Sequence, residues 1–150
     1  RVPALVTDDG QHFCESPVIC EYLDMLVPEP QIIPTSGKAR FDALALSALA
    51  HGIMDSSVSC VLEGRRPQEK QYRPWIERKE AAIVRSLEMM TAQLPHVDIF
   101  DIGTISAVVA LDYIAIRQPH IDWRSTHPAL AKWHEAQSRR PSFVATIPEV

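Results

Sequence analysis

The first apolar positions of the chain follow the spacing of β-strands. Ala4 to Thr7 is an apolar, partly β-branched run, and Gln11 to Cys14 alternates polar with apolar residues. Asp8-Asp9-Gly10 between them is a turn signal, so the pattern predicts a β-hairpin. An isolated hairpin is barely stable in water, and we therefore expect further sheet to precede it.

The pattern then changes to a helical period. Ser16 with Pro17 is typical of a helix start, an N-cap followed by proline at the first helical position. The apolar residues after it recur at helical spacing as far as Leu26. Residues 1–26 are expected to form strand, turn, strand and helix.

A proline-rich connector follows this opening. Three of the eight residues from Val27 to Pro34 are prolines. This density excludes a helix and favours a semi-rigid linker over 27–36. We place the domain boundary here, with a second domain over 37–150.

Every long segment of this second domain has helical periodicity. The predicted helices run from Lys38 to Glu63, from Pro74 to Gln93, from Ile102 to Ile116, and from His127-Pro128 to the residue before Pro141. The third is nearly all apolar, which predicts a buried central helix. The fold class expected is α+β and mostly α, with an all-α bundle after the hairpin unit.

Two of these helices carry local signals beyond their period. Asp101 and Thr104 are placed as a capping box at the start of the third helix, with Phe100 and Ile105 as a hydrophobic staple. The first helix is unusually rich in small residues, above all from Ser47 to Ser59. Small side chains permit either close helix packing or room for a ligand.

Composition and charge exclude several classes of protein. The chain has 150 residues, of which 46% are hydrophobic and 23% charged, as in soluble globular domains. A disordered tail, a collagen-like repeat and a disulfide scaffold are excluded. The 15 basic and 19 acidic side chains give a net charge of −4. Without a basic stripe, we expect no nucleic-acid partner.

The cysteines indicate a reducing compartment. Cys14, Cys20 and Cys60 cannot all pair within one chain and form no CxxC motif, so we expect reduced thiols in a cytoplasmic protein. The free thiols are expected to behave as small buried hydrophobes.

Membrane and targeting segments are not expected. The longest apolar run, Ala43 to Leu62, contains His51 and Asp55 and is too polar for a membrane span, so no membrane partner is expected. The sequence begins with Arg1-Val2-Pro3, which resembles no signal peptide and includes no initiator Met. We expect the gene product to begin upstream.

Several common chemistries lack their motifs. The six histidines show no i, i+4 pair and no cysteine partner at zinc-finger spacing, so no metal site is expected. The chain has no GxSxG nucleophile elbow and no Gly-rich phosphate loop.

The informative residues are Val2-Pro3 and, ten residues later, Glu15-Ser16. Proline lacks the donor that a strand ladder needs, and a cis peptide would reconcile its place by turning the backbone toward a ligand. Glu15-Ser16 lies where a strand ends and a helix begins, so backbone N–H groups and a hydroxyl suit a carboxylate there. The acidic side chain suits an ammonium group. A ligand with both groups is an amino-acid terminus.

With these residues in place, the chain resembles a known family, the cytosolic glutathione S-transferases. Residues 2–24, VPALVTDDGQHFCESPVICEYLD, look like the second half of the family's thioredoxin-like domain. FDIGTISAVVALDYIAIR, at 100–117, resembles its buried capped helix, and HPALAKWHEAQSRRPSF, at 127–143, its closing helix. The resemblance implies a bacterial-type member with a thioredoxin-like part over 1–26 and the family's helical domain over 37–150.

The resemblance also implies roles for individual residues. Val2 would offer backbone hydrogen bonds to the cysteinyl part of glutathione, and Pro3 would be the cis residue. Glu15 and Ser16 would bind the γ-glutamyl amine and carboxylate. Asp55 looks like the acidic residue that in some members reaches a γ-glutamyl group across a dimer interface. A solvated Asp55 and a ligand-free helix cap at Glu15-Ser16 are the alternatives.

Two departures from the family pattern matter. In the family's capping box Ser or Thr comes first and Asp follows three residues later, whereas here Asp101 comes first and Thr104 follows. The family's opening β-α-β segment is also missing, and with it the Tyr, Ser or Cys that activates the thiol, which we expect upstream of Arg1. His12 and Cys14 are weak candidates for that role, so the catalytic residue stays unknown.

The function expected from the resemblance is a detoxifying, homodimeric glutathione S-transferase. It would use glutathione as co-substrate and conjugate the thiolate to small hydrophobic electrophiles. The small-sided helix, from Ser47 to Ser59, would line the electrophile site if it does not serve packing alone. The alternatives are a non-catalytic binding or scaffolding protein of the same fold and a helical bundle with an incidental hairpin.

Overall fold

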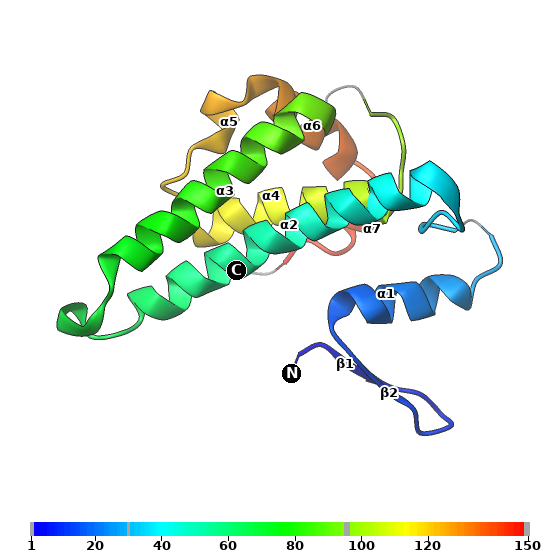
Figure 1. Ribbon diagram of the computed structural model, residues 1–150. Coiled ribbons are helices and arrows are strands. Elements are labelled where there is room, and N and C mark those ends of the chain that lie inside the picture. The colour runs from blue at the N-terminus through cyan, green and yellow to red at the C-terminus, as the bar shows by residue number, and fades with distance from the viewer. Residues whose placement is uncertain (1, 30, 95–96, 149–150) are drawn as a thin grey trace.

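A computed structural model describes residues 2–29, 31–94 and 97–148 as a small hairpin unit and a bundle of helices (Figure 1). The elements in chain order are β1 Ala4–Val6, β2 His12–Cys14, α1 Ser16–Met25, α2 Gly37–Gly64, η1 Gln68–Lys70 (a 3-10 turn), α3 Arg73–Gln93, α4 Ile102–Arg117, α5 Trp123–Thr126, α6 Pro128–Ser138 and α7 Pro141–Val144. The predicted fold class, α+β and mostly α, is confirmed.

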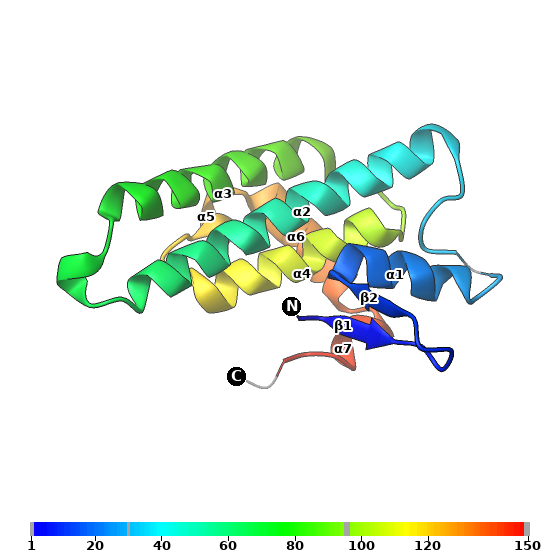
Figure 2. The same cartoon turned by 60° about the horizontal axis from the view of Figure 1, so that its bottom comes forward.

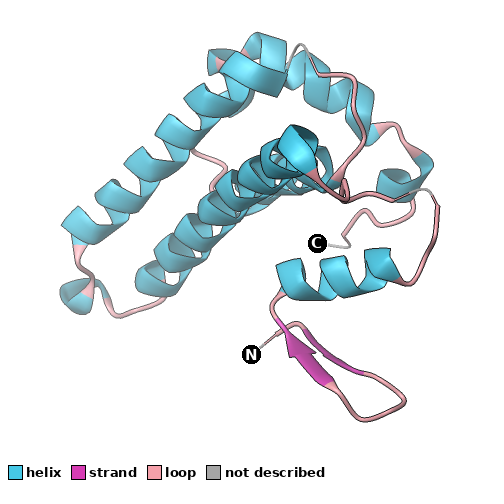
Figure 3. Ribbon diagram, turned by 45° about the vertical axis from the view of Figure 1, so that its right-hand side comes forward, coloured by secondary structure: helices cyan, strands magenta, loops and turns pink. Residues whose placement is uncertain are grey.

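The hairpin forms where the strand pattern predicts it. β1 pairs antiparallel with β2, with Leu5 opposite Phe13. In the turn, the Gly10 N–H donates to the Thr7 carbonyl at 2.9 Å, and Gly10 has a φ of 83°, which glycine adopts without strain. Phe13 stacks on Tyr22 of α1 with ring centroids 4.7 Å apart. Figure 3 shows α1 between the hairpin and the helical bundle.

The core of the bundle lies where α3 and α4 pack on α2 (Figure 2), and α6 contacts α3 and α4. The apolar face of α4 is buried, as its sequence predicts. The fully buried side chains include Ile53 of α2, Ile83 and Leu87 of α3, Leu111 and Ile114 of α4, and Leu130 of α6. Burial of such side chains is the main favourable contribution to folding.

The small residues of α2 allow α4 to approach closely. A Cβ atom built on Gly103 of α4 would lie 2.7 Å from the Ala43 carbonyl oxygen and 3.1 Å from the Leu46 Cβ. Ala43, Ser47 and Ala50 are buried along this contact. At this end of α2, small side chains therefore serve helix packing.

The start of α4 has the predicted capping box. The Asp101 carboxylate accepts from the Thr104 N–H at 2.9 Å, and the Thr104 hydroxyl oxygen accepts from the Asp101 N–H at 3.0 Å. The reversed order of Asp and Thr therefore keeps both bonds. Loss of such a cap typically costs about 1 kcal/mol.

The connector is tied to the elements on both sides of it. The Asp24 carboxylate at the end of α1 accepts from the Ile32 N–H at 2.7 Å and the Ile33 N–H at 3.0 Å. The Ile32 carbonyl accepts from the Ile102 N–H of α4 at 3.0 Å. An ion pair between Glu21 of α1 and Arg40 of α2 also joins the two units.

Three short elements differ from the sequence interpretation. Residues Trp123–Thr126 form a helical turn, α5, in which the Asp122 carboxylate accepts from the Ser125 N–H at 3.3 Å. Trp123 is 2% exposed and packs edge-on against His134. Single turns such as α5, α7 and η1 are too short to show a period, so periodicity does not reveal them.

The cysteines differ from each other in burial. Cys60 is buried, as expected, but Cys14 is exposed and Cys20 half-buried, and all three are free thiols. The expectation of buried thiols is therefore wrong for Cys14, which lies at the end of β2.

By length and composition alone, α2 could cross a membrane. A core helix of a soluble protein meets the same test, and α2 buries a face that includes Ile53 and Ser57. The helix thus serves as the wall that both α3 and α4 pack against.

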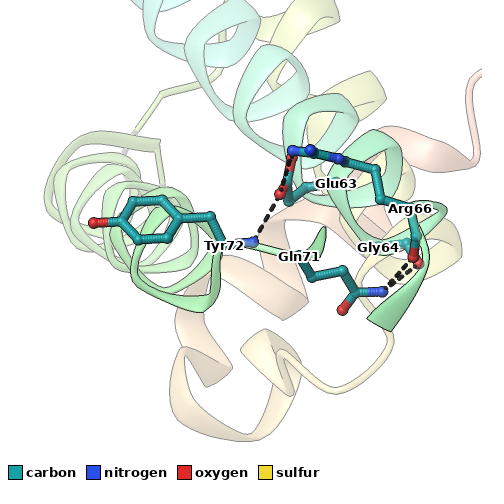
Figure 4. Close-up of polar contacts among 5 residues, drawn as sticks. All are labelled: Glu63, Gly64, Arg66, Gln71 and Tyr72. Atoms are coloured by element: carbon teal, nitrogen blue, oxygen red, sulfur yellow. Dashed lines mark hydrogen bonds and ion pairs between the residues drawn. The ribbon is translucent and has the colours of Figure 1, made fainter. Parts of the chain in front are cut away.

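The turn from α2 to α3 is held by polar side chains (Figure 4). Glu63 accepts from the Tyr72 N–H at 2.8 Å and pairs with Arg66 at 3.0 Å. The Gln71 amide donates to the carbonyls of Gly64 at 3.0 Å and of Arg66 at 2.8 Å. These bonds satisfy carbonyl groups that the end of a helix leaves without partners.

We expect this turn to weaken in acid. The hydrogen bond from the Tyr72 N–H, and to a smaller extent Arg66, holds the pKa of Glu63 below its usual value. A lowered folded-state pKa means that the stabilisation is fully present above the unfolded-chain value of about 4.3 and is lost as the pH falls through the folded value. Glu63→Gln should lower the urea midpoint at neutral pH and flatten its decline between about pH 5 and pH 3.

The matched control is Glu69→Gln, which removes an exposed carboxylate of η1 in the same turn. Its pH profile should follow that of the unmodified protein. Equal profiles for both variants would contradict the role assigned to Glu63.

Candidate glutathione site

The register of the hairpin brings the two halves of the expected site together. Ala4 of β1 pairs with Cys14 of β2. In an antiparallel pair the residues before the first strand therefore lie beside those after the second, which sets Val2-Pro3 next to Glu15-Ser16. The Val2-Pro3 peptide is cis, as expected, and residue Val2 is 93% exposed. Its backbone is thus open to a ligand.

Glu15 has a strained backbone at the junction of β2 and α1. Its φ of 73° is the only positive value among the described residues other than glycine. Such a conformation is uncommon for a side chain larger than glycine's and often accompanies a functional site. The Glu15 carbonyl accepts the first helical bond, from the Ile19 N–H at 3.1 Å.

The structure corrects the assignment of the helix cap. Glu15, not Ser16, is the N-cap of α1, and its side chain makes no capping hydrogen bond. Ser16 is the first helical residue. The Ser16 hydroxyl therefore does not supply the cap of α1.

That hydroxyl contacts the helical bundle. Ser16 Oγ lies 3.2 Å from His51 Nε2 of α2, and His51 Nδ1 lies 2.7 Å from the Ser47 carbonyl oxygen. The Ser47 hydroxyl in turn lies 3.0 Å from the hydroxyl of Ser106 in α4. A chain of polar contacts therefore runs from the candidate site across α2 to α4.

Sequence reasoning missed His51 as a site residue. It was noted only as a polar interruption of an apolar run. The available signal was its spacing, because Ser47, His51 and Asp55 lie four residues apart and share one face of a helix.

Asp55 lies on α2 one turn beyond His51 and is exposed. Its carboxylate makes no hydrogen bond or ion pair with another described residue, whereas its carbonyl accepts from the Ser59 hydroxyl at 2.8 Å. The structure thus leaves Asp55 accessible but does not bring it into contact with Ser16 or Glu15.

The serines beyond Asp55 have local partners. The Ser57 hydroxyl donates to the Ile53 carbonyl at 3.0 Å and is fully buried. Ser59 bonds the Asp55 carbonyl in the same way. These hydroxyl groups satisfy their own helix, so packing explains this part of α2 better than a ligand pocket does.

The thiols of the helices do not favour a thiolate. Burial raises the pKa of the Cys20 thiol on α1, and burial followed by the Glu80 carboxylate raises that of Cys60. A raised pKa lowers the fraction of the reactive thiolate. His12 and Cys14 lie on exposed positions of β2, and Cys14 comes directly before the N-cap residue Glu15.

A second cluster combines the residue types of a hydrolase. His134 Nε2 lies 2.8 Å from the Asp112 carboxylate and 3.3 Å from the Ser138 hydroxyl. A catalytic triad needs the acid and the serine on opposite ring nitrogens, whereas here both contact the same one. His134 is 5% exposed and packs on Trp123, so the cluster is structural. Among the described residues no group of three or more His, Cys, Asp or Glu could hold a metal.

Comparison with protein families assigns both units. A model of the glutathione S-transferase N-terminal domain matches residues 1–26, and a model of the C-terminal domain matches residues 73–136. The two matches thus name the N-terminal and C-terminal domains of one family.

Individual relatives agree with these matches. The chain is 31% identical to an uncharacterised GST-like protein of Escherichia coli, YibF, over 99% of this chain and 75% of that protein. A similar solved structure is a glutathione transferase family member from Pseudomonas fluorescens with bound S-(propanoic acid)-glutathione. It is 40% identical with a TM-score of 0.96, and the match covers 100% of this chain and 78% of the Pseudomonas chain. A glutathione S-transferase from Methylobacillus flagellatus with bound glutathione is 34% identical, with a TM-score of 0.93 over 99% and 76% of the two chains. The chain belongs to the glutathione S-transferase family, and its resemblance to bacterial-type members is confirmed.

Proposed function

We propose that the protein is a glutathione S-transferase that conjugates the glutathione thiolate to small hydrophobic electrophiles. The observation that carries this proposal is the placement of Val2-Pro3 beside Glu15-Ser16 by the Ala4–Cys14 register. Solved relatives that match the whole chain hold glutathione or a glutathione derivative.

Each residue of the site suits one group of glutathione. The Ser16 hydroxyl and the free N–H groups in the first turn of α1 would donate to the γ-glutamyl carboxylate, which the helix dipole also favours. The Glu15 carboxylate would accept from the ammonium group. The exposed backbone of Val2, ahead of Pro3, would pair with the cysteinyl amide.

A homodimer would complete the site. Asp55 is exposed on α2 and lacks a partner within the described part of the chain. In a dimer, this carboxylate would reach the γ-glutamyl ammonium group bound by the other protomer. We expect such a dimer to act in the cytoplasm, in detoxification.

Conjugation also requires an ionised thiol. The glutathione thiol resembles that of free cysteine, with a pKa of about 8.5, and becomes nucleophilic only as the thiolate. A hydrogen-bond donor to the thiolate lowers that pKa and raises the reactive fraction at neutral pH. The described residues leave this role unassigned.

Binding and turnover can be measured separately. Calorimetric titration with glutathione should show saturable binding, while cysteinylglycine, which lacks the γ-glutamyl group, should bind far more weakly. Conjugation to a chloronitrobenzene, followed by absorbance, reports transfer. Binding without turnover would favour the non-catalytic alternative, and equal affinity for the two thiols would contradict the site.

A further inference from the structure

The hydroxyl that the proposed function assigns to the ligand carboxylate already has a partner in the helical bundle. Ser16 Oγ lies 3.2 Å from His51 Nε2, and both residues are half-buried. The contact joins the first turn of α1 to the middle of α2. A ligand at Ser16 therefore acts on a hydrogen bond that exists without it.

The other ring nitrogen of His51 determines the direction of this bond. Nδ1 lies 2.7 Å from the Ser47 carbonyl oxygen. A carbonyl oxygen only accepts, so Nδ1 carries a hydrogen. In the neutral ring Nε2 then bears a lone pair, and the Ser16 hydroxyl must donate its hydrogen to His51.

A carboxylate at Ser16 competes for the same hydrogen. Carboxylate oxygens also only accept, and a serine hydroxyl has one hydrogen to donate. Either the bond to His51 breaks, or Nε2 takes a proton from solvent. In the second case, Nε2–H donates to Ser16 Oγ, and the Ser16 hydrogen turns to the carboxylate. Every donor then has an acceptor, and a positive ring faces a negative ligand.

We infer that His51 is a positioning residue that takes up a proton when a γ-glutamyl carboxylate binds at Ser16. This inference rests on the proposed function. His51 holds the Ser16 hydroxyl in place from α2, and protonation reverses the direction of their hydrogen bond.

The elements that meet at His51 carry acidic and uncharged groups. The acidic residues are Glu15, which precedes Ser16 at the start of α1, and Asp55, which lies one turn beyond His51 on α2. From α4 comes the uncharged Ser106 hydroxyl, through its 3.0 Å contact with Ser47. None of these three residues is a cation that would repel a proton added to His51.

Proton uptake can be measured directly. S-methylglutathione is the probe, because its sulfur cannot titrate. Calorimetric titrations at neutral pH in two buffers with different ionisation enthalpies report the protons taken up per ligand bound. The unmodified protein should take up a measurable fraction of one proton, and its affinity should fall, by at most about tenfold per pH unit, from about pH 6 to pH 8.

Three variants test the assignment. His51→Gln keeps an amide that can reach Ser16 but does not titrate, so uptake should disappear and the affinity profile should become flat. Ser16→Ala removes the hydroxyl between ring and carboxylate, so uptake should decrease. His120→Gln, which changes a half-exposed histidine paired with Glu80, should keep the uptake of the unmodified protein.

The outcomes separate the inference from the function. Binding without proton uptake, or equal uptake in His51→Gln, overturns the role of His51 and leaves the glutathione site standing. Undiminished proton uptake in Ser16→Ala also overturns the role of His51. If His51→Gln does not fold, the comparison with Ser16→Ala is the deciding test. If the unmodified protein does not bind the probe at any pH, the proposed function fails and the inference fails with it.

Discussion

Gly103→Ala is expected to destabilise the protein by about 1 to 3 kcal/mol, the usual cost of overpacking. The new methyl group would lie 2.7 Å from the Ala43 carbonyl oxygen, closer than real Cβ contacts allow. That oxygen belongs to the backbone of α2, which cannot move without disturbing its own helix. Urea denaturation followed by circular dichroism, at one fixed protein concentration, measures the change.

The matched control is Gly52→Ala on the facing helix. A Cβ atom there would meet nothing within 4 Å. Alanine is a better helix former than glycine by about 0.8 to 1 kcal/mol, so this variant should be more stable than the unmodified protein. If both variants gain stability, the close contact between α2 and α4 is not as tight as described.

Ser16→Ala is expected to weaken glutathione binding by about 1 to 3 kcal/mol, the cost of leaving a charged acceptor without its donor. This corresponds to a loss of affinity of about 5- to 150-fold. The substitution removes the donor to the carboxylate and also ends the contact with His51. Calorimetric titration with glutathione measures the loss.

Two further variants define the result. Ser16→Thr keeps the hydroxyl and should retain most of the affinity. Ser125→Ala removes an exposed hydroxyl from α5, away from α1, and should bind as the unmodified protein does. An unchanged affinity in Ser16→Ala would show that the carboxylate binds elsewhere.

Much of the fold could be predicted because its signals are local. The hairpin follows from strand alternation around Asp8-Asp9-Gly10, and the start of α4 follows from Asp101 and Thr104, whose side chains bond groups three residues away. The single turn that buries Trp123 could not be predicted, because its burial depends on packing against α6.

The candidate site shows the same division. Val2-Pro3 stands out in sequence because a proline lies at the start of a strand pattern, and Glu15-Ser16 stands out because it lies where a strand ends and a helix begins. The His51 contact joins positions 35 residues apart and depends on how α1 meets α2, so the helical spacing of Ser47 and His51 marks a shared face but does not reveal the contact. The helix cap was misassigned for a related reason, since the backbone angle of Glu15 is not a property of its residue type.

The hydrogen bonds that hold the connector between the two units should protect it from proteases. A protease must draw several residues into an extended form before it can cut, and a proline-rich segment between two domains is an obvious target. Ile32, however, is fastened through its N–H to Asp24 and through its carbonyl to Ile102. Cleavage at this residue would first have to release both ends of the clamp, so limited digestion should spare it while the fold is intact.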